Sequence, residues 1–161
     1  MRKSGKKIYL ILQNIRSLYN VGAIFRSADA FAVSKIYLTG YTGAPPRKEI
    51  SKTGLGAEKY ILWEKHWQAS RLIKKLKKQK VQIIALEQTK KAQNIRCFKP
   101  KFPIALIVGN EVKGITPKIL KLADKILKIP MHGKKESLNV SVATGIALYD
   151  LNRKIWYNNR K

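Results

Sequence analysis

The sequence has few of the residues that build covalent or metal-bound frameworks. It contains one cysteine, Cys97, and two histidines, His66 and His132, among 161 residues. A single cysteine excludes an internal disulfide, and no Cys/His cluster has the spacing of a zinc site. We therefore expect no metal, and we interpret Cys97, in a polar connection beside Phe98, as a thiol without a catalytic role.

The N-terminal segment lacks a long apolar run. Only the five apolar residues from Ile8 to Leu12 come together before Gln13. That run is too short for the apolar region of a signal peptide or for a membrane span. The expected location is therefore the cytoplasm, without membrane association.

Two common nucleotide-binding motifs are incomplete or absent. Residues 109–116 have the G-x-x-x-x-G spacing and final threonine of a phosphate-binding loop, but Ile115 occupies the position of the required lysine. No G-x-G-x-x-G motif follows the first apolar segment. ATP hydrolysis and ordinary dinucleotide binding are therefore disfavoured.

Acidic residues are scarce as well. Nine Asp and Glu stand against 34 Lys and Arg, which gives a net charge of +25, although 45% of the residues are hydrophobic. A folded chain with this charge is expected to bind a polyanion. RNA, DNA and an anionic membrane all satisfy that expectation, and a general effect on solubility is the alternative.

Apolar strand-like and helix-like segments alternate along the chain. Strands are predicted at residues 6–13, 34–38, 60–63, 81–86, 103–108 and 125–129, and helices at 21–31, 67–80, 117–123 and from Ser137 onward. Asn20 is expected to cap the helix at 21–31 and Ser137 the last one. The pattern predicts an α/β fold, a mostly parallel sheet with helices on both faces, within one domain of residues 1–161.

The C-terminal stretch, residues 129–156, places a polar loop containing Gly133 between a strand and a helix. The apolar residues of this helix are predicted to be Val140, Ala143, Ile146, Ala147 and Leu151. Such a loop exposes backbone amides at a helix N-terminus and suits a small polar ligand. An ordinary strand–loop–helix connection is the alternative.

Three segments resemble the signature motifs of the SpoU/TrmH branch of the SPOUT methyltransferases. They are NIRSLYNVGAIFRSADAF at residues 14–31, IVGNEVKGI at 107–115 and IPMHGKKESLNVSVATGIALYD at 129–150, in the order of the family. The resemblance implies a C-terminal trefoil knot, a rare exception to unknotted topology. It also implies a homodimer that uses S-adenosyl-L-methionine to methylate a ribose 2′-hydroxyl in tRNA or rRNA. Longer relatives carry an extra RNA-binding extension, whereas for this chain we expect the catalytic domain without one.

The resemblance also implies which residues hold the cofactor. They are Leu86, Gly109, Ile129, Met131 and Leu138, largely through backbone groups. Gly109 lacks a Cβ and so permits close approach of a ligand, although a turn glycine would look the same. Ile129 and Met131 are equally suited to the core.

Five polar residues match the family's catalytic positions: Asn20, Arg26, Glu111, Ser137 and Asn139. Each has a structural alternative, such as surface charge for Arg26 or helix capping for Ser137. An arginine normally stays protonated, so we expect Arg26 to bind a phosphate and stabilise the developing alkoxide, whether or not it accepts the proton.

Two other classes of function remain open on the residues alone. One is a non-catalytic RNA-binding protein that keeps the fold, and the other is a basic protein of the membrane surface, for which no basic helix with large aromatic anchors is found. Contacts to RNA are expected from the exposed basic residues Lys74, Lys75, Lys77, Lys78, Arg47 and Lys48.

Overall fold

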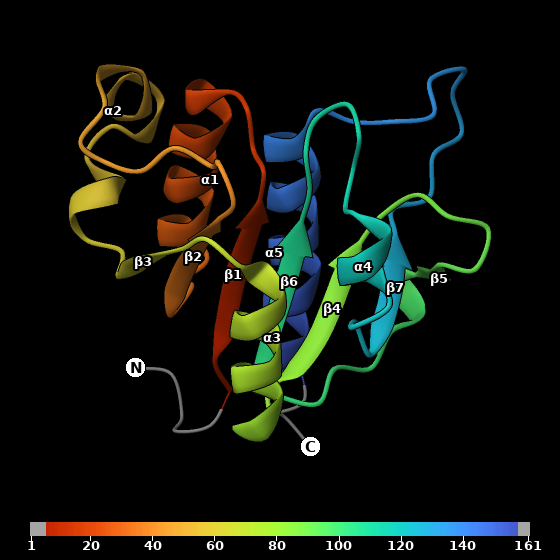
Figure 1. Ribbon diagram of the computed structural model, residues 1–161. Helices are drawn as coiled ribbons and strands as arrows, with labels where there is room; N and C mark the ends of the chain where they lie inside the picture. Colours follow the sequence, from red (N-terminus) through yellow and green to blue (C-terminus); the bar gives the residue numbers. More distant parts are fainter. Residues whose placement is uncertain (1–5, 158–161) are drawn as a thin grey trace.

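The computed structural model describes residues 6–157. Its strands and helices alternate along the chain, as Figure 1 shows. In order they are β1 (Ile8–Gln13), α1 (Leu18–Ala30), β2 (Lys35–Thr39), α2 (Lys48–Gly54), η1 (Ala57–Lys59), β3 (Trp63–His66), α3 (Ala69–Lys78), β4 (Gln82–Leu86), β5 (Gln93–Asn94), η2 (Ile95–Cys97), β6 (Ile104–Val108), α4 (Pro117–Leu120), β7 (Lys125–Lys128) and α5 (Val140–Tyr157).

The strands form one sheet in the order β3-β2-β1-β6-β4-β7-β5. Every neighbouring pair is parallel, which confirms the predicted α/β fold. Because all strands run in the same direction, they all end at one edge of the sheet, here called the carboxyl edge. Ligands of open parallel sheets bind outside this edge.

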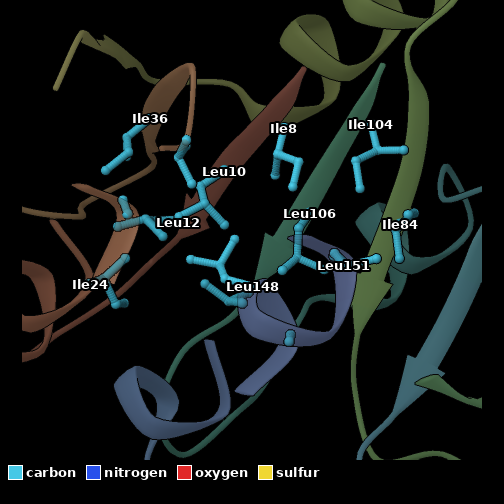
Figure 2. Close-up of a cluster of buried hydrophobic side chains, with 14 of the residues drawn as sticks. Ile8, Leu10, Leu12, Ile24, Ile36, Ile84, Ile104, Leu106, Leu148 and Leu151 are labelled. Atoms are coloured by element: carbon cyan, nitrogen blue, oxygen red, sulfur yellow. The ribbon is translucent and has the colours of Figure 1, made fainter. Parts of the chain in front are cut away.

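Helices cover both faces of the sheet, because successive strand residues point to opposite sides. In β1, Leu10 packs in a cluster with residues of α1 and α5, whereas Ile11 packs in the other cluster with α3 and α4. Figure 2 shows Leu148 and Leu151 of α5 near Leu106 of β6. Full burial of each such side chain stabilises the fold by roughly 1.5–3 kcal/mol.

The first helix begins earlier than the sequence predicted. Its N-cap is Ser17, whose side chain accepts a hydrogen bond from the Asn20 N–H at 3.3 Å. Capping by Asn20 was therefore a wrong prediction, since a serine three residues upstream takes that role. As a result, the Asn20 side chain lies within the first turn of α1 and is available for contacts outside the helix.

The edges of the sheet also differ from the prediction. β3 begins at Trp63, three residues later than expected, because the apolar residues Tyr60 to Leu62 form the connection between η1 and β3. Tyr60 and Leu62 are 79% and 69% exposed, so their hydrophobicity did not reflect burial. The two-residue β5 carries no apolar pattern and was not predicted.

Within residues 6–157, none of the helices is both long enough and apolar enough to cross a bilayer. The same residues contain no group of three or more His, Cys, Asp or Glu side chains arranged to hold a metal ion. The trefoil knot implied by the resemblance stays a prediction.

Candidate active site

A cavity of about 410 Å³ lies at the carboxyl edge, where β4, β6 and β7 end. Its volume falls within the range of small-molecule sites, about 300–1,000 Å³. The walls come from residues 86–89 after β4, residues 108–115 after β6, Ile129 after β7, Leu120, and Ser137, Leu138, Val140 and Ala143 at the start of α5. Segments far apart in the sequence therefore meet at one site.

The wall that follows β6, residues 109–116, is here called the pocket loop. Its buried Asn110 donates through Nδ2 to the Asn14 carbonyl and to the Tyr41 hydroxyl, both at 3.0 Å. The Asn110 Oδ1 accepts the N–H groups of Val112 and Lys113 at 2.9 and 2.8 Å. One buried amide thus fixes the loop to itself and to the ends of two strands.

Close packing holds the other end of the pocket loop. A Cβ on Gly109 would lie 2.5 Å from both Gly114 C and Ile115 N, so glycine is required by the approach of the chain to itself. The ligand-approach explanation for Gly109 is therefore not needed. Glu87, directly after β4, accepts the Ile115 N–H at 2.8 Å and joins the loop to the neighbouring strand.

Glu111 links the pocket loop to the turn that precedes α1. Its carboxylate accepts the N–H groups of Arg16 and Ser17, both at 2.9 Å, and the Asn20 side-chain amide at 3.0 Å. Three donors converge on one carboxylate from the N-terminal end of a helix, where negative charge is favoured.

These donors determine the ionisation of Glu111. Partial burial would raise its pKa, but the hydrogen bonds from the Arg16 N–H, the Asn20 side chain and the Ser17 N–H outweigh that effect and hold the pKa below its usual value. The group is therefore a carboxylate at neutral pH and acts as an acceptor rather than as a proton donor.

Asn139 extends this network to α5. Its Nδ2 donates to the Asn20 Oδ1 at 3.2 Å, while its Oδ1 accepts from the N–H and the hydroxyl of Ser141 at 2.9 and 2.6 Å. Asn139 therefore caps α5, and the prediction that Ser137 caps this helix was wrong. Ser137 instead lies exposed in the cavity wall. Three separate elements are joined in the order Glu111, Asn20, Asn139.

A model of the SpoU rRNA Methylase family matches residues 7–149, which is most of the chain. The chain belongs to the SpoU family. One curated family relative is the tRNA (guanosine(18)-2′-O)-methyltransferase of Aquifex aeolicus, which is 35% identical over 96% of this chain and 72% of its own length.

Solved structures of SpoU proteins have the same fold. The A. aeolicus TrmH/SpoU tRNA modifying enzyme superposes with a TM-score of 0.88 at 34% identity, over 98% of this chain and 80% of that one. The AdoMet-bound rRNA methyltransferase of Sinorhizobium meliloti gives a TM-score of 0.87 at 28% identity, over 95% of this chain. This chain spans 58% of the length of the Sinorhizobium protein.

Four of the five residues that the SpoU resemblance assigned to the cofactor line the cavity: Leu86, Gly109, Ile129 and Leu138. The fifth, Met131, is half-buried beyond the end of β7 and lies outside the lining. Spacing along the sequence could not separate Met131 from Ile129, because the chain turns away from the cavity between them. Their roles in binding stay predictions.

Arg26 is the one SpoU catalytic candidate that stands apart. It is exposed on α1, outside the cavity lining, about 9 Å further along the helix than Asn20. Its neighbour Ser27 lines a shallow groove between α1 and α5 together with Phe31, Ser141, Val142, Gly145, Ile146 and Tyr149. Arg26 is therefore outside the cavity lining of its own chain, and the residue next to it in the sequence belongs to an exposed groove.

Sequence reasoning missed several residues of the site. Glu87 could have been found from the sequence, because it directly follows a predicted buried strand and is one of only nine acidic residues in the chain. Gln88 donates to the Ile129 carbonyl at 2.9 Å, and Tyr41 supports Asn110 from a different strand. Nothing in the local sequence indicates these two contacts, because they depend on which strands are neighbours.

The predicted basic residues lie in two places. α3 begins near the carboxyl edge and runs back to the start of β4, so Lys77 and Lys78 at its end are remote from the cavity (Figure 1). Lys77 also forms an ion pair with Asp124 at 2.8 Å. Arg47 and Lys48, in contrast, are exposed in the segment that follows β2 beyond the carboxyl edge.

Proposed function

We propose that this protein transfers the methyl group of S-adenosyl-L-methionine to a ribose 2′-hydroxyl in transfer or ribosomal RNA. The observation that carries the proposal is the cavity at the carboxyl edge of a SpoU-family chain, with Glu111, Asn20 and Asn139 joined beside it. The A. aeolicus relative is a tRNA 2′-O-methyltransferase, and the Sinorhizobium structure holds AdoMet.

The cavity has the chemistry that this cofactor requires. Apolar side chains such as Leu86, Ile129 and Leu138 suit an adenine ring, and the backbone of the pocket loop offers polar groups for the remaining atoms. When bound, S-adenosyl-L-methionine supplies an electrophilic methyl group on a sulfonium. The fixed pocket loop would hold it without reorganisation, which favours binding.

Arg26 is proposed to act on the acceptor. A ribose hydroxyl is a poor nucleophile unless its developing negative charge is stabilised. The guanidinium of Arg26 would bind the adjacent phosphate with its fork of donors and stabilise the alkoxide. Asn20 and Glu111 would fix the start of α1, the helix that carries Arg26.

A homodimer completes this arrangement. Val142, Ile146 and Tyr149 on α5 are 50%, 40% and 60% exposed, and they line the groove beside Arg26. Pairing two copies through the α1–α5 face would cover these side chains and bring Arg26 of one protomer toward the cavity of the other. Ile146 shares the helical spacing of the buried Ala147 and Leu151, yet it is exposed, which supports an interface at this face.

The test is a methylation assay with labelled S-adenosyl-L-methionine and bulk cellular RNA, followed by mapping of the labelled ribose. Arg26→Lys keeps the charge but loses the fork, and it should reduce single-turnover methylation on the order of 100-fold. Cofactor binding without methylation of any RNA would favour the non-catalytic alternative. Normal rates for Arg26→Lys would refute the assigned role.

Two further points belong to the proposal. We place the protein in the cytoplasm, because the relative from A. aeolicus acts on tRNA. We also propose that residues 1–161 form one catalytic domain whose own basic surface binds RNA, supported by a family match that covers residues 7–149.

A further inference from the structure

Two exposed aromatic residues follow neighbouring strands, β2 and β3, at the carboxyl edge and lie outside the lining of the cavity. Trp67 is 78% exposed and Tyr41 is 58% exposed. The Gly40 N–H donates to the His66 carbonyl at 3.2 Å and joins the ends of β2 and β3. Tyr41 directly follows Gly40, and Trp67 directly follows His66. Large aromatic side chains with this exposure are not explained by packing in the fold.

Tyr41 connects this pair directly to the pocket loop. Its hydroxyl accepts a hydrogen bond from Asn110 at 3.0 Å, and its N–H donates to the Asn14 Oδ1 at 3.3 Å. In the strand order β3-β2-β1-β6, Trp67 follows the edge strand β3 and Tyr41 follows its neighbour β2, on the side of the sheet that leads to the pocket loop after β6.

A lysine side chain, Lys65, lies close to the Trp67 ring. The Lys65 Nζ lies 5.3 Å from the centre of the Trp67 ring, and it also donates to the Thr42 carbonyl. Glu64, the acidic residue of β3, is paired with Lys35 and His66. The exposed Trp67 ring is therefore accessible to a base and lies beside a lysine whose ammonium group is fixed by the Thr42 carbonyl.

We propose that Trp67 and Tyr41 form a stacking surface for single-stranded nucleotides that flank the target nucleotide of the RNA substrate. This inference rests on the proposed function and adds the form of RNA that the site accepts. Unpaired bases stack on aromatic side chains, whereas the stacked bases of a duplex cannot. The enzyme would therefore select its target within a loop or another unpaired segment.

The test compares binding of a short single-stranded oligoadenylate with binding of an RNA duplex of equal length, by fluorescence anisotropy without cofactor. Trp67→Ala should weaken binding of the single strand about tenfold, within the range of one lost stacking contact. Duplex affinity and the salt dependence of binding should not change, because no phosphate contact is removed. Trp67→Phe should restore most of the single-strand affinity.

Tyr60 supplies the control, since it is an equally exposed aromatic that precedes β3 instead of following it. Tyr60→Ala should bind both RNAs like the wild type. Unchanged single-strand binding by Trp67→Ala, an equal loss for the duplex, or failure of Trp67→Phe to restore binding would each overturn the stacking surface. Because the measurement needs neither cofactor nor turnover, absence of methylation would affect the proposed function and not this result.

Discussion

Two of the loops that line the cavity are built in opposite ways. The pocket loop is tied down by the buried Asn110, by the close packing of Gly109 and by the carboxylate of Glu87. The β7–α5 loop, residues 129–139, is exposed from His132 to Asn139, and a Cβ on its Gly133 would meet nothing within 4 Å. This loop is held at its two ends, where the Ile129 carbonyl accepts from Gln88 and Asn139 donates to Asn20.

The difference assigns different tasks to the two loops. A segment with few contacts changes conformation at low cost, whereas a segment cross-linked by buried hydrogen bonds does not. The pocket loop therefore presents a preformed wall, and the β7–α5 loop can adjust around a bound ligand. Ordering of the second loop is then part of the free energy of binding.

The largest expected effect comes from the polar link of the pocket loop. Glu111→Gln replaces an acceptor oxygen with a donor amide that faces the N–H groups of Arg16 and Ser17, so the start of α1 must shift. Methylation should fall about 100-fold, as displacement of a catalytic group by about 1 Å can cause. The rate is measured under single-turnover conditions with saturating cofactor.

Glu136 provides the matched control for this variant. It is an exposed acid of the β7–α5 loop, so Glu136→Gln removes the same charge without changing any contact of Glu111. Its methylation rate should equal that of the wild type. Equal losses in both variants would show that net charge, rather than the contacts of Glu111, controls the rate.

A second comparison uses one glycine from each loop, Gly109 of the pocket loop and Gly133 of the β7–α5 loop. Gly109→Ala would force the backbone of Gly114 and Ile115 apart and should lower the free energy of unfolding by about 1–3 kcal/mol or more. Gly133→Ala has open space around it and should leave stability nearly unchanged. Chemical denaturation of both variants measures the contrast, and equal stability of the two would contradict a rigid pocket loop.

Helix capping gives a smaller difference between neighbouring residues. Asn139→Ala removes the acceptor for the Ser141 N–H and should reduce stability by about 1 kcal/mol. Ser137→Ala should have no effect on unfolding, because its side chain does not cap the helix. Thermal unfolding distinguishes these outcomes, and destabilisation by Ser137→Ala alone would restore the original assignment of the cap.

The sequence was informative where local chemistry determines the structure. Apolar segments predicted five of the seven strands and the parallel sheet, because buried parallel strands need continuous hydrophobic runs. A sixth strand, β3, was expected three residues too early. The resemblance to the SpoU family also implied Leu86, Gly109, Ile129 and Leu138, which all line the cavity. Strand ends of a parallel sheet meet at one edge, so motifs placed there were bound to come together.

Prediction from the sequence failed where contacts between residues far apart in the chain determine the structure. Ser17 and Asn20 are both good caps, and the choice between them follows from the bond between Asn20 and Glu111, 91 residues away. Ile146 has the spacing of a core residue but faces an exposed groove, because helical periodicity cannot distinguish a core from an interface. The contact of Tyr41 with Asn110 could not be predicted from the sequence, because it depends on the position of β2 relative to the pocket loop.

The smallest expected effect is the pH dependence of the stability that Glu111 contributes. The hydrogen bonds to Glu111 lower its pKa in the folded protein, so its charged form stabilises the fold. That stabilisation is complete above the pKa of an unfolded glutamate, about 4.3, and is lost as the pH falls through the lower folded value. The difference in unfolding free energy between wild type and Glu111→Gln should therefore be constant from neutral pH down to about 4.3 and shrink below it. A difference that instead grows as the pH falls would mean that the pKa of Glu111 is raised, and that burial rather than the three donors controls this carboxylate.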